Sequence, residues 1–156
     1  MPRAKIKSAD TSKVERYLEF IGSVHLSGLG MDEATFKIDR AAYAAFVPKA
    51  EKNLAEISGR HEVINRHPNS FVVVGHYEVS VKGDSDQVLV SLRCRYSALF
   101  ALDKEAEEEF IERFAQNEAR LVFWPYLRHF ISDSTYRMSI TPLRLPLSSE
   151  FLDSKT

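Results

Sequence analysis

The amino-acid sequence predicts an α+β domain in which an antiparallel sheet comes first and two helices then pack on one side of it. Two neighbouring segments in the middle of the chain alternate between apolar and polar residues, which is typical of strands with one buried face. After residue 102 the apolar residues recur every three or four positions, which is typical of helices. Strands followed by helices indicate the α+β class, and a chain of 156 residues fits a single domain. We expect residues 1–15 and 149–156 to be flexible tails of this domain.

The composition excludes several classes of protein. The chain is 44% hydrophobic and 28% charged, which are globular values, and its net charge of −1 is a poor match for a nucleic-acid partner. Cys94 is its single cysteine and cannot form an intramolecular disulfide, which fits a reducing compartment. Residues 1–13 are too polar for a signal peptide, and the longest apolar run, residues 121–127, is far shorter than the ~20 residues that span a bilayer. We therefore expect a cytoplasmic protein without membrane insertion.

An antiparallel hairpin over residues 71–102 is the most regular feature. A short connection, Gly83-Asp84-Ser85-Asp86, joins two alternating segments, as in a β-hairpin. Each segment has one apolar face that we expect to be buried. The first face comprises Phe71, Val73, Tyr77, Val79 and Val81, and the second Val88, Val90, Leu92, Cys94, Tyr96, Ala98, Phe100 and Leu102.

The segment before the hairpin is less regular. We expect a strand near Phe20 to Leu29, with bends or bulges at its glycines. A short strand at residues 62–66 precedes the turn His67-Pro68-Asn69-Ser70. Residues 41–57 are rich in alanine and lysine and fit either a helix or an irregular segment, although Pro48 argues against one unbroken helix.

Two helices are expected after the hairpin. Asp103 is a suitable N-cap for the first, and the glutamates that follow it complement the positive end of a helix. Its buried stripe is Ala106, Phe110 and Phe114. The second helix covers residues 118–136, and Pro125 should kink it or set its first turns apart. The proline-spaced stretch 140–147 should then be extended and pack through its leucines.

Candidate catalytic and metal-binding residues are few. No two of the five histidines have the i, i+4 spacing of a helical metal site, and no Cys-x-x-Cys motif accompanies them. Cys94 falls on the inward face of a strand, which favours a buried thiol over a nucleophile. We therefore expect no metal, no cofactor and no enzymatic activity. A small-ligand-binding or enzymatic domain that uses His25 or His76 in a pocket remains an alternative.

Surplus aromatic residues mark the second helix. Phe123, Trp124, Tyr126 and Phe130 are four aromatics within eight positions, more than one helix face can bury. Trp124 and Tyr126 would then point toward an oligomer interface or an apolar groove. A helix buried on two sides is the alternative.

Three motifs make this chain resemble the SecB family of protein-export chaperones. The family's Leu-Phe-Pro-Tyr-Ala-Arg-like motif is matched by residues 123–128, Phe-Trp-Pro-Tyr-Leu-Arg. The family's Gly-Gly-Ile/Leu-Phe strand end is similar to Ser-Ala-Leu-Phe at residues 97–100. Its Phe-Pro-x-Leu-x-Leu-x-Pro-Val stretch is similar to residues 140–147. The matches occur in the family's order and cover about residues 86–147.

The resemblance implies a four-stranded antiparallel sheet with two helices, assembled as a homotetramer that is a dimer of dimers. Such a protein is an ATP-independent holdase that binds unfolded or pre-secretory polypeptides in apolar and aromatic grooves and keeps them soluble for export or folding. Family position makes a small set of apolar residues the candidates for client binding. They are Phe100, Trp124, Tyr126, Leu143 and Leu145.

The exposed sheet face departs from the family pattern. Family members that deliver clients to the export motor SecA carry acidic residues there, whereas Ser91, Arg93 and Arg95 occupy the corresponding positions here. We expect these three residues to form a solvated or partner-facing surface, with SecA the less favoured partner. A solitary or toxin–antitoxin-associated SecB-like chaperone, with an antitoxin as its client, is an alternative. A structural protein with one fixed partner is another.

Overall fold

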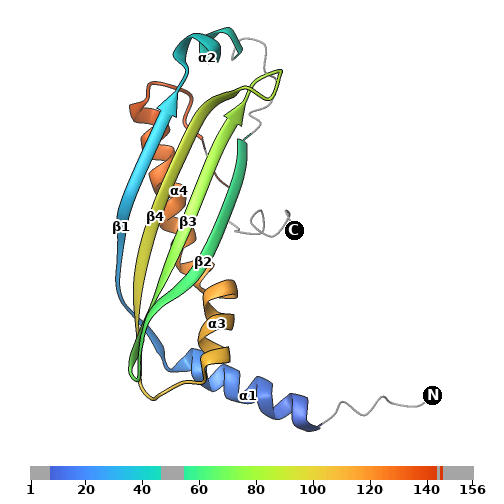
Figure 1. The fold of residues 1–156 in the computed structure, drawn as a ribbon, viewed down its shortest axis with the longest axis vertical. Helices are drawn as coiled ribbons and strands as arrows, with labels where there is room; N and C mark the ends of the chain where they lie inside the picture. The colour runs from blue at the N-terminus through green and yellow to red at the C-terminus, as the bar shows by residue number, and fades with distance from the viewer. Residues whose placement is uncertain (1–7, 47–54, 144, 146–156) are drawn as a thin grey trace, which may run out of the picture.

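The structure is a computed structural model that describes residues 8–46, 55–143 and 145, and it confirms the α+β class. Its four strands form one antiparallel sheet of order β1-β4-β3-β2. Two helices, α3 and α4, pack on one face of this sheet, and the other face is open (Figure 1). No helix in the described ranges is long and apolar enough to span a bilayer. The elements are α1 (Ser8–Gly22), β1 (Val24–Ile38), α2 (Arg40–Phe46), β2 (Ala55–His67), β3 (Ser70–Lys82), β4 (Val88–Leu102), α3 (Glu108–Asn117) and α4 (Ala119–Arg137).

The predicted hairpin is confirmed as β3 and β4, which pair in continuous register up to Val81. The two predicted inward faces meet across the pair, as in the opposition of Tyr77 to Cys94, and are buried against the helices. Val88 is the exception: it is exposed, and Leu89 is buried in its place. The register shift between Val81 and Lys82 accounts for this change of face, because an irregularity of one residue inverts the alternation.

Gly75 occupies the inward position between Val73 and Tyr77. A Cβ atom at Gly75 would lie 2.9 Å from Cε2 of Tyr77. The glycine therefore gives the Tyr77 ring the space in which it lies, and any larger residue would displace it.

Aromatic rings join the sheet to α3. Phe114 packs edge-on against Phe71 and Phe100, with its ring centroid 5.0 Å from that of Phe100. The stripe predicted for this helix is therefore confirmed at Phe110 and Phe114, both buried. The predicted N-cap is wrong: α3 begins at Glu108 after Glu107, and Asp103 instead bonds His25.

The N-terminal part of the fold corrects the prediction. Phe20 lies in α1, not in a strand, and residues 8–15 belong to this helix and not to a tail. Tyr17 and Phe20 of α1 pack against Phe110, with ring centroids 5.4 Å and 5.9 Å away. The following strand begins at Val24 and contains two bulges, one of them at Ser27, next to Gly28. Residues 149–156 lie outside the described residues.

The segment between β1 and β3 is partly helical and partly extended. Arg40–Phe46 forms α2, and β2 begins at Ala55, so the strand predicted at residues 62–66 is much longer. The turn predicted at residues 67–70 is confirmed, because β3 starts at Ser70. Pro48 lies outside the described residues.

The second predicted helix is α4, one residue later than expected, with Pro125 inside it. The chain then folds back along this helix through residues 140–143 and 145, which we call the returning stretch, and its predicted packing through leucines is confirmed at Leu143 and Leu145. Residues 144, 146 and 147 lie outside the described residues. Leu143 N–H donates to Thr135 Oγ1 over 2.9 Å, and Arg128 Nε donates to Leu145 O over 3.1 Å. Because both leucines are buried, this stretch forms a second wall against α4.

Candidate functional site

Four of the five predicted client-binding residues belong to the core. Phe100 is 1% exposed, Trp124 3%, and Leu143 and Leu145 6% each. Their side chains are not exposed in this conformation, and their assignment to client binding stays a prediction. Tyr126, at 48%, is the exception and is available for binding.

The burial of Trp124 has a structural reason. It lies four residues before Arg128, whose side chain bonds the Leu145 carbonyl, and therefore near the same side of α4. At about 100° per residue, Trp124 lies next to Ile131 on one continuous arc of α4 with Phe123 and Leu127, all of which are buried. Trp124 therefore belongs to one broad buried arc of α4, whereas Tyr126 lies outside this arc and is exposed.

A strip of exposed apolar side chains runs along β1 and was not predicted as a site. Leu26, Met31 and Phe36 are 45%, 40% and 55% exposed, and we call these three residues the β1 strip. They lie directly opposite Phe100, Tyr96 and Leu92, all of which are buried. Opposed residues share one face of a sheet. The β1 strip is therefore the continuation of the hydrophobic core on a strand that the helices leave uncovered.

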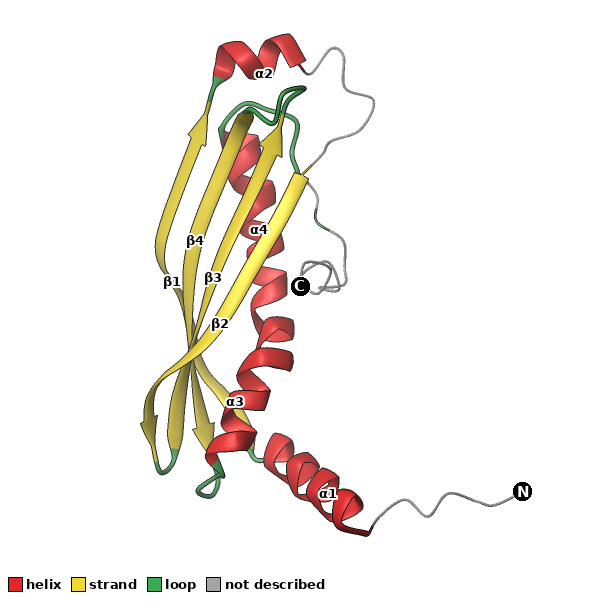
Figure 2. Ribbon diagram, turned by 45° about the vertical axis from the view of Figure 1, so that its right-hand side comes forward, coloured by secondary structure: helices red, strands yellow, loops and turns green. Residues whose placement is uncertain are grey.

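Tyr126 extends the same surface from the helix side. The Tyr96 hydroxyl donates to the Tyr126 carbonyl over 3.4 Å, and Tyr96 is the register partner of Met31. The backbone of Tyr126 and the exposed Met31 thus both lie next to one buried tyrosine. In Figure 2, β1 lies at the edge of the sheet farthest from α3, which leaves this side of the strand open.

The outer edge of β1 adds backbone groups to this surface. Among the described strands β1 pairs only with β4, so the other edge of this fifteen-residue strand carries N–H and C=O groups that no described strand satisfies. An exposed edge of this length is a template for another extended chain. Apolar side chains beside free backbone groups are the chemistry that an unfolded polypeptide can use without a defined sequence.

A signal for this surface was present in the sequence but was not regular. Leu26, Met31 and Phe36 are spaced by five residues, whereas a regular strand keeps even spacing on one face. The bulges insert Ser27 and Asp32 as extra residues, and each restores the apolar residues to the helix side. A search for alternation alone therefore could not find the β1 strip.

The opposite edge strand, β2, carries a buried polar pair. Nε2 of His61 lies 2.6 Å from the Tyr77 hydroxyl, and its ring stacks on Phe123 with centroids 5.8 Å apart. Burial, with a smaller effect of Arg120 and His76, lowers the pKa of His61 to about 4. Burial raises the pKa of Tyr77, so both groups are neutral near pH 7. Their arrangement packs the core and offers no proton at neutral pH.

The remaining candidate catalytic groups are separated from one another. Burial raises the pKa of Cys94 to about 12, which makes its thiol a poor nucleophile. His25 Nε2 lies 3.0 Å from an Asp103 carboxylate oxygen, and His76 Nε2 lies 2.8 Å from Oε1 of Glu62. Within the described ranges no group of three or more potential metal ligands forms.

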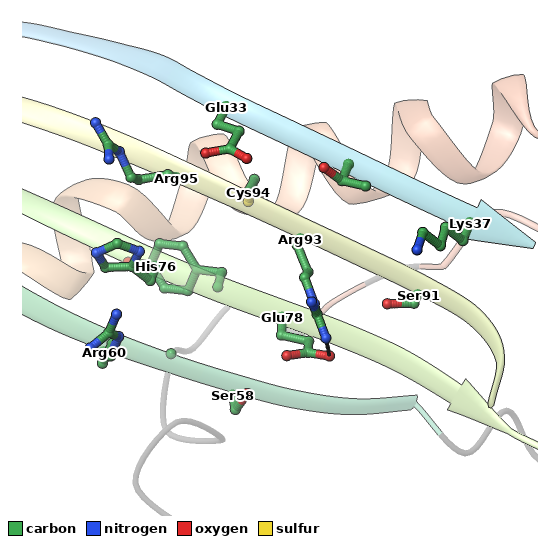
Figure 3. Close-up of a pocket in the computed structure, with 13 residues that line it drawn as sticks. Glu33, Lys37, Ser58, Arg60, His76, Glu78, Ser91, Arg93, Cys94 and Arg95 are labelled. Atoms are coloured by element: carbon green, nitrogen blue, oxygen red, sulfur yellow. Dashed lines mark hydrogen bonds and ion pairs between the residues drawn. The ribbon is translucent and has the colours of Figure 1, made fainter. Parts of the chain in front are cut away.

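The open face of the sheet contains a broad trough of about 940 Å³. Ser91, Arg93 and Arg95 all project into it from β4, as their alternation predicts (Figure 3). Arg93 bonds Glu78 over 3.1 Å, and Arg95 bonds Asp32 over 3.3 Å. His76 also lines this trough, but the trough is open to solvent and is not the closed cavity that a pocket around His25 or His76 would require.

The fold defined by this sheet, its helices and the returning stretch is the SecB-like fold. The chain is similar in structure to the SecB-like chaperone Rv1957 of Mycobacterium tuberculosis, solved in complex with a ChAD peptide from the HigA1 antitoxin Rv1956. The TM-score is 0.69 at 17% sequence identity, over 92% of this chain and 100% of that one. A protein of unknown function from Streptococcus agalactiae aligns with a TM-score of 0.45 at 12% identity, over 79% of this chain and 96% of that one. In sequence, no protein-family model and no curated protein matches this chain.

Proposed function

We propose that this protein is an ATP-independent holdase chaperone that binds unfolded polypeptides along the β1 strip and keeps them soluble. The observation that carries the proposal is the uncovered continuation of the core on β1, formed by Leu26, Met31 and Phe36. Covering apolar surface contributes about 25 cal/mol per Å², whatever the sequence of the client. The SecB-like fold supports this activity over catalysis. We place the chaperone in the cytoplasm, where nascent and pre-secretory chains would be its clients.

The contact with a client would combine two kinds of interaction. Side chains of the client would pack on the β1 strip and on Tyr126, and its backbone would pair with the free edge of β1. A homotetramer built as a dimer of dimers is part of this proposal. The same edge could then be shared between subunits, so that client binding and assembly would use adjacent parts of one surface.

Aggregation suppression tests the proposal. A denatured, unrelated protein is diluted with and without this protein, in the absence of nucleotide, and light scattering is followed. Suppression at near-stoichiometric amounts is expected, and the double variant M31S/F36S should lose most of it. The matched control is V14S/L18S, which removes exposed apolar side chains from α1. Thermal unfolding of all samples verifies that each is folded.

Each result has a distinct meaning. No suppression by the folded wild-type protein would overturn the holdase proposal. Suppression that V14S/L18S and M31S/F36S reduce equally would retain a holdase but remove the assignment of the β1 strip. Loss confined to M31S/F36S supports both.

A dedicated antitoxin chaperone is the second candidate function. The observation in its favour is that the similar protein Rv1957 was solved with a peptide from an antitoxin. Here the client would be one aggregation-prone antitoxin, captured by the same strip. This candidate predicts that one antitoxin peptide binds the protein with a low micromolar dissociation constant. Unrelated unfolded chains should then neither bind nor be protected from aggregation.

A further inference from the structure

One face of α1 lies on α3 in the way that a helical ligand lies in a groove. This face consists of four side chains, Lys13, Arg16, Tyr17 and Phe20. Their spacing of i, i+3, i+4 and i+7 is that of the anchor residues of a helix bound in a groove. In Figure 2, the N-terminal turns of α1 extend beyond α3 and away from the sheet. The contact therefore rests on residues 13–20, and the proposed holdase does not use it.

Phe110 is the centre of the contact on the α3 side. Its ring centroid lies 5.4 Å from that of Tyr17 and 5.9 Å from that of Phe20, and the guanidinium carbon of Arg16 lies 5.8 Å from it. Within the described ranges, every ring contact of Phe110 comes from α1. Phe110 is buried, so the burial of this ring depends on α1.

The attachment of α3 to the sheet does not depend on α1. Gln116 donates to the His61 carbonyl over 3.0 Å, and the guanidinium of Arg66 forms ion pairs with Glu108 and Glu112. None of these residues belongs to α1, so α3 would stay in place if α1 moved away. The surface around Phe110 would then be open to another segment.

The rim around Phe110 is acidic, and α1 supplies the opposite charges. Lys13 Nζ donates to Oε1 of Glu109 over 2.5 Å, and Arg16 Nη1 donates to Oε1 of Glu107 over 2.7 Å. All four side chains are largely exposed, and exposed ion pairs contribute little to stability. Such pairs determine which segment fits this surface more than how tightly it is held.

The acidic character of this surface remains when all its charges are counted. Residues 104–118 contain six glutamates and two cations, Lys104 and Arg113. Arg66, which bonds two of the glutamates, and Arg120 of α4 raise the number of cations to four. Six carboxylates against four cations leave an excess of negative charge, so a basic occupant is favoured over an acidic one.

An aromatic residue of the occupant has a place of its own in this surface. The Tyr17 hydroxyl donates to a carboxylate oxygen of Glu118 over 2.6 Å. The guanidinium carbon of Arg113 lies 4.1 Å from the centroid of the Tyr17 ring, within the range of a cation–π contact. Burial, with the hydrogen bond to Glu118, raises the pKa of Tyr17, so the hydroxyl stays protonated and able to donate. The surface therefore recognises an aromatic ring as well as basic groups.

We propose that the surface around Phe110 is a second binding site, which α1 occupies in the free protein and a basic, aromatic helix of a partner protein can take over. The partner helix carries two basic residues and then two aromatic residues at the spacing i, i+3, i+4 and i+7. Because α1 is tethered beside the site, it competes at a high effective concentration. The apparent affinity for the partner is reduced to the fraction of molecules from which α1 has moved away. The site lies on α3, away from the β1 strip, so the inference does not depend on the holdase activity.

Competition with a peptide that has the sequence of α1 tests the inference. The probe is a fluorescein-labelled peptide of residues 8–23, and fluorescence anisotropy measures its affinity for the full-length protein. The variant K13E/R16E places carboxylates against Glu107 and Glu109, which should loosen the protein's own α1. The peptide should therefore bind this variant at least fivefold more tightly than it binds the wild-type protein. A peptide with the substitutions Y17S/F20S should bind neither protein.

Two further variants test whether the gain occurs at the proposed site. The variant K13E/R16E/F110S lacks the ring that receives the peptide and should lose the gain. The variant K13E/R16E/E107K/E109K restores the internal ion pairs with reversed signs and repels the peptide, so it should bind at least tenfold more weakly than K13E/R16E. Thermal unfolding verifies that each variant is folded, and the second of them changes exposed side chains only.

Matched controls separate this site from the rest of the molecule. The variant V14S/L18S changes the exposed side of α1 and should bind the peptide within about twofold of wild type. The variant M31S/F36S should do the same, so that this inference and the holdase proposal can fail separately. Equal affinity of the wild-type protein and K13E/R16E, or a gain that K13E/R16E/F110S and K13E/R16E/E107K/E109K both retain, would overturn the inference. Self-association of the wild-type protein that K13E/R16E abolishes would also overturn it, because the occupant would then be α1 of a second copy.

Discussion

The two edge strands of the sheet differ in how the helices cover them. At β2, Gln116 of α3 donates to the His61 carbonyl over 3.0 Å, and the guanidinium of Arg66 forms ion pairs with Glu108 and Glu112. The His61 ring is stacked on Phe123 of α4. At β1, the residues on the same face of the sheet, Leu26, Met31 and Phe36, are open to solvent.

The cause of the difference is the placement of the helices. Of the two helices that pack on the face of the sheet, α3 contacts β2 and α4 contacts β3, so this helical layer is displaced away from β1. A sheet with one uncovered apolar edge has a cost in solubility. Binding of another chain would cover this edge. Substitutions at covered and uncovered residues should therefore differ in their effect on the free energy of unfolding.

The largest effect is expected at Phe100, on the covered side. Phe100 is fully buried between Phe71 and Phe114, so truncation leaves a cavity. We expect Phe100→Ala to lower the free energy of unfolding by about 3–5 kcal/mol. Urea denaturation followed by circular dichroism measures it. A loss below 1 kcal/mol would mean that Phe100 is not a core residue, in favour of its original assignment to a groove.

A smaller loss in the free energy of unfolding is expected at Thr135, which attaches the returning stretch to α4. Thr135 Oγ1 accepts from the Leu143 N–H and donates to the Ile131 carbonyl over 2.8 Å. Thr135→Val leaves the buried N–H of Leu143 without its acceptor and should cost about 1–3 kcal/mol. Hydrogen exchange should show faster exchange of the Leu143 amide, whereas Thr135→Ser, which keeps the hydroxyl, should retain its protection. Unchanged exchange in Thr135→Val would contradict this attachment.

Acidification tests the covered edge strand. The folded pKa of His61 is about 4, below its ordinary value of 6.5, so the unfolded chain binds this proton more readily. Stability from the neutral His61 is therefore present above pH 6.5, falls as the pH drops toward 4, and changes no further below that. Allowing for its partial exposure, we expect a loss of about 1–2 kcal/mol across this range. Denaturation at several pH values should show a smaller loss in His61→Gln, and parallel profiles would contradict the assignment.

The smallest effect is expected at Leu26, the register partner of Phe100. Because its side chain is nearly half exposed, Leu26→Ala should change the free energy of unfolding by no more than about 0.5 kcal/mol. Urea denaturation at two protein concentrations is the measurement. A loss above 2 kcal/mol that grows with protein concentration would show that a second chain covers the β1 strip.

The sequence was most informative where local pattern and burial coincide. Strands β3 and β4 and helix α4 were predicted within a few residues, because continuous alternation or helical spacing determines which side is apolar. α1 was not predicted: its N-terminal half is polar, and Phe20, near its end, reads equally well as the start of a strand. Only packing on Phe110 distinguishes the two interpretations.

The candidate site was less predictable than the fold. Phe100, Trp124, Leu143 and Leu145 are apolar in sequence, but their burial depends on which distant segment covers them. Trp124 lies on the buried arc of α4 next to Ile131, although the number of aromatics in this helix had suggested that it points away from the core. The open placement of Arg93 and Arg95 was predictable, since alternation alone assigns a face.

The two bulges of β1 also bear on how this strand can change during evolution. Ser27 is an extra residue opposite a single step of β4, from Phe100 to Leu99. Deleting one codon there would remove the bulge, yet Gly28 would keep Leu99 as its partner and every later side chain would keep its face. The same deletion inside β4 would turn half of the core outward. β1 can therefore gain or lose single residues, and so vary its curvature and the spacing of its exposed side chains, while the rest of the sheet is preserved.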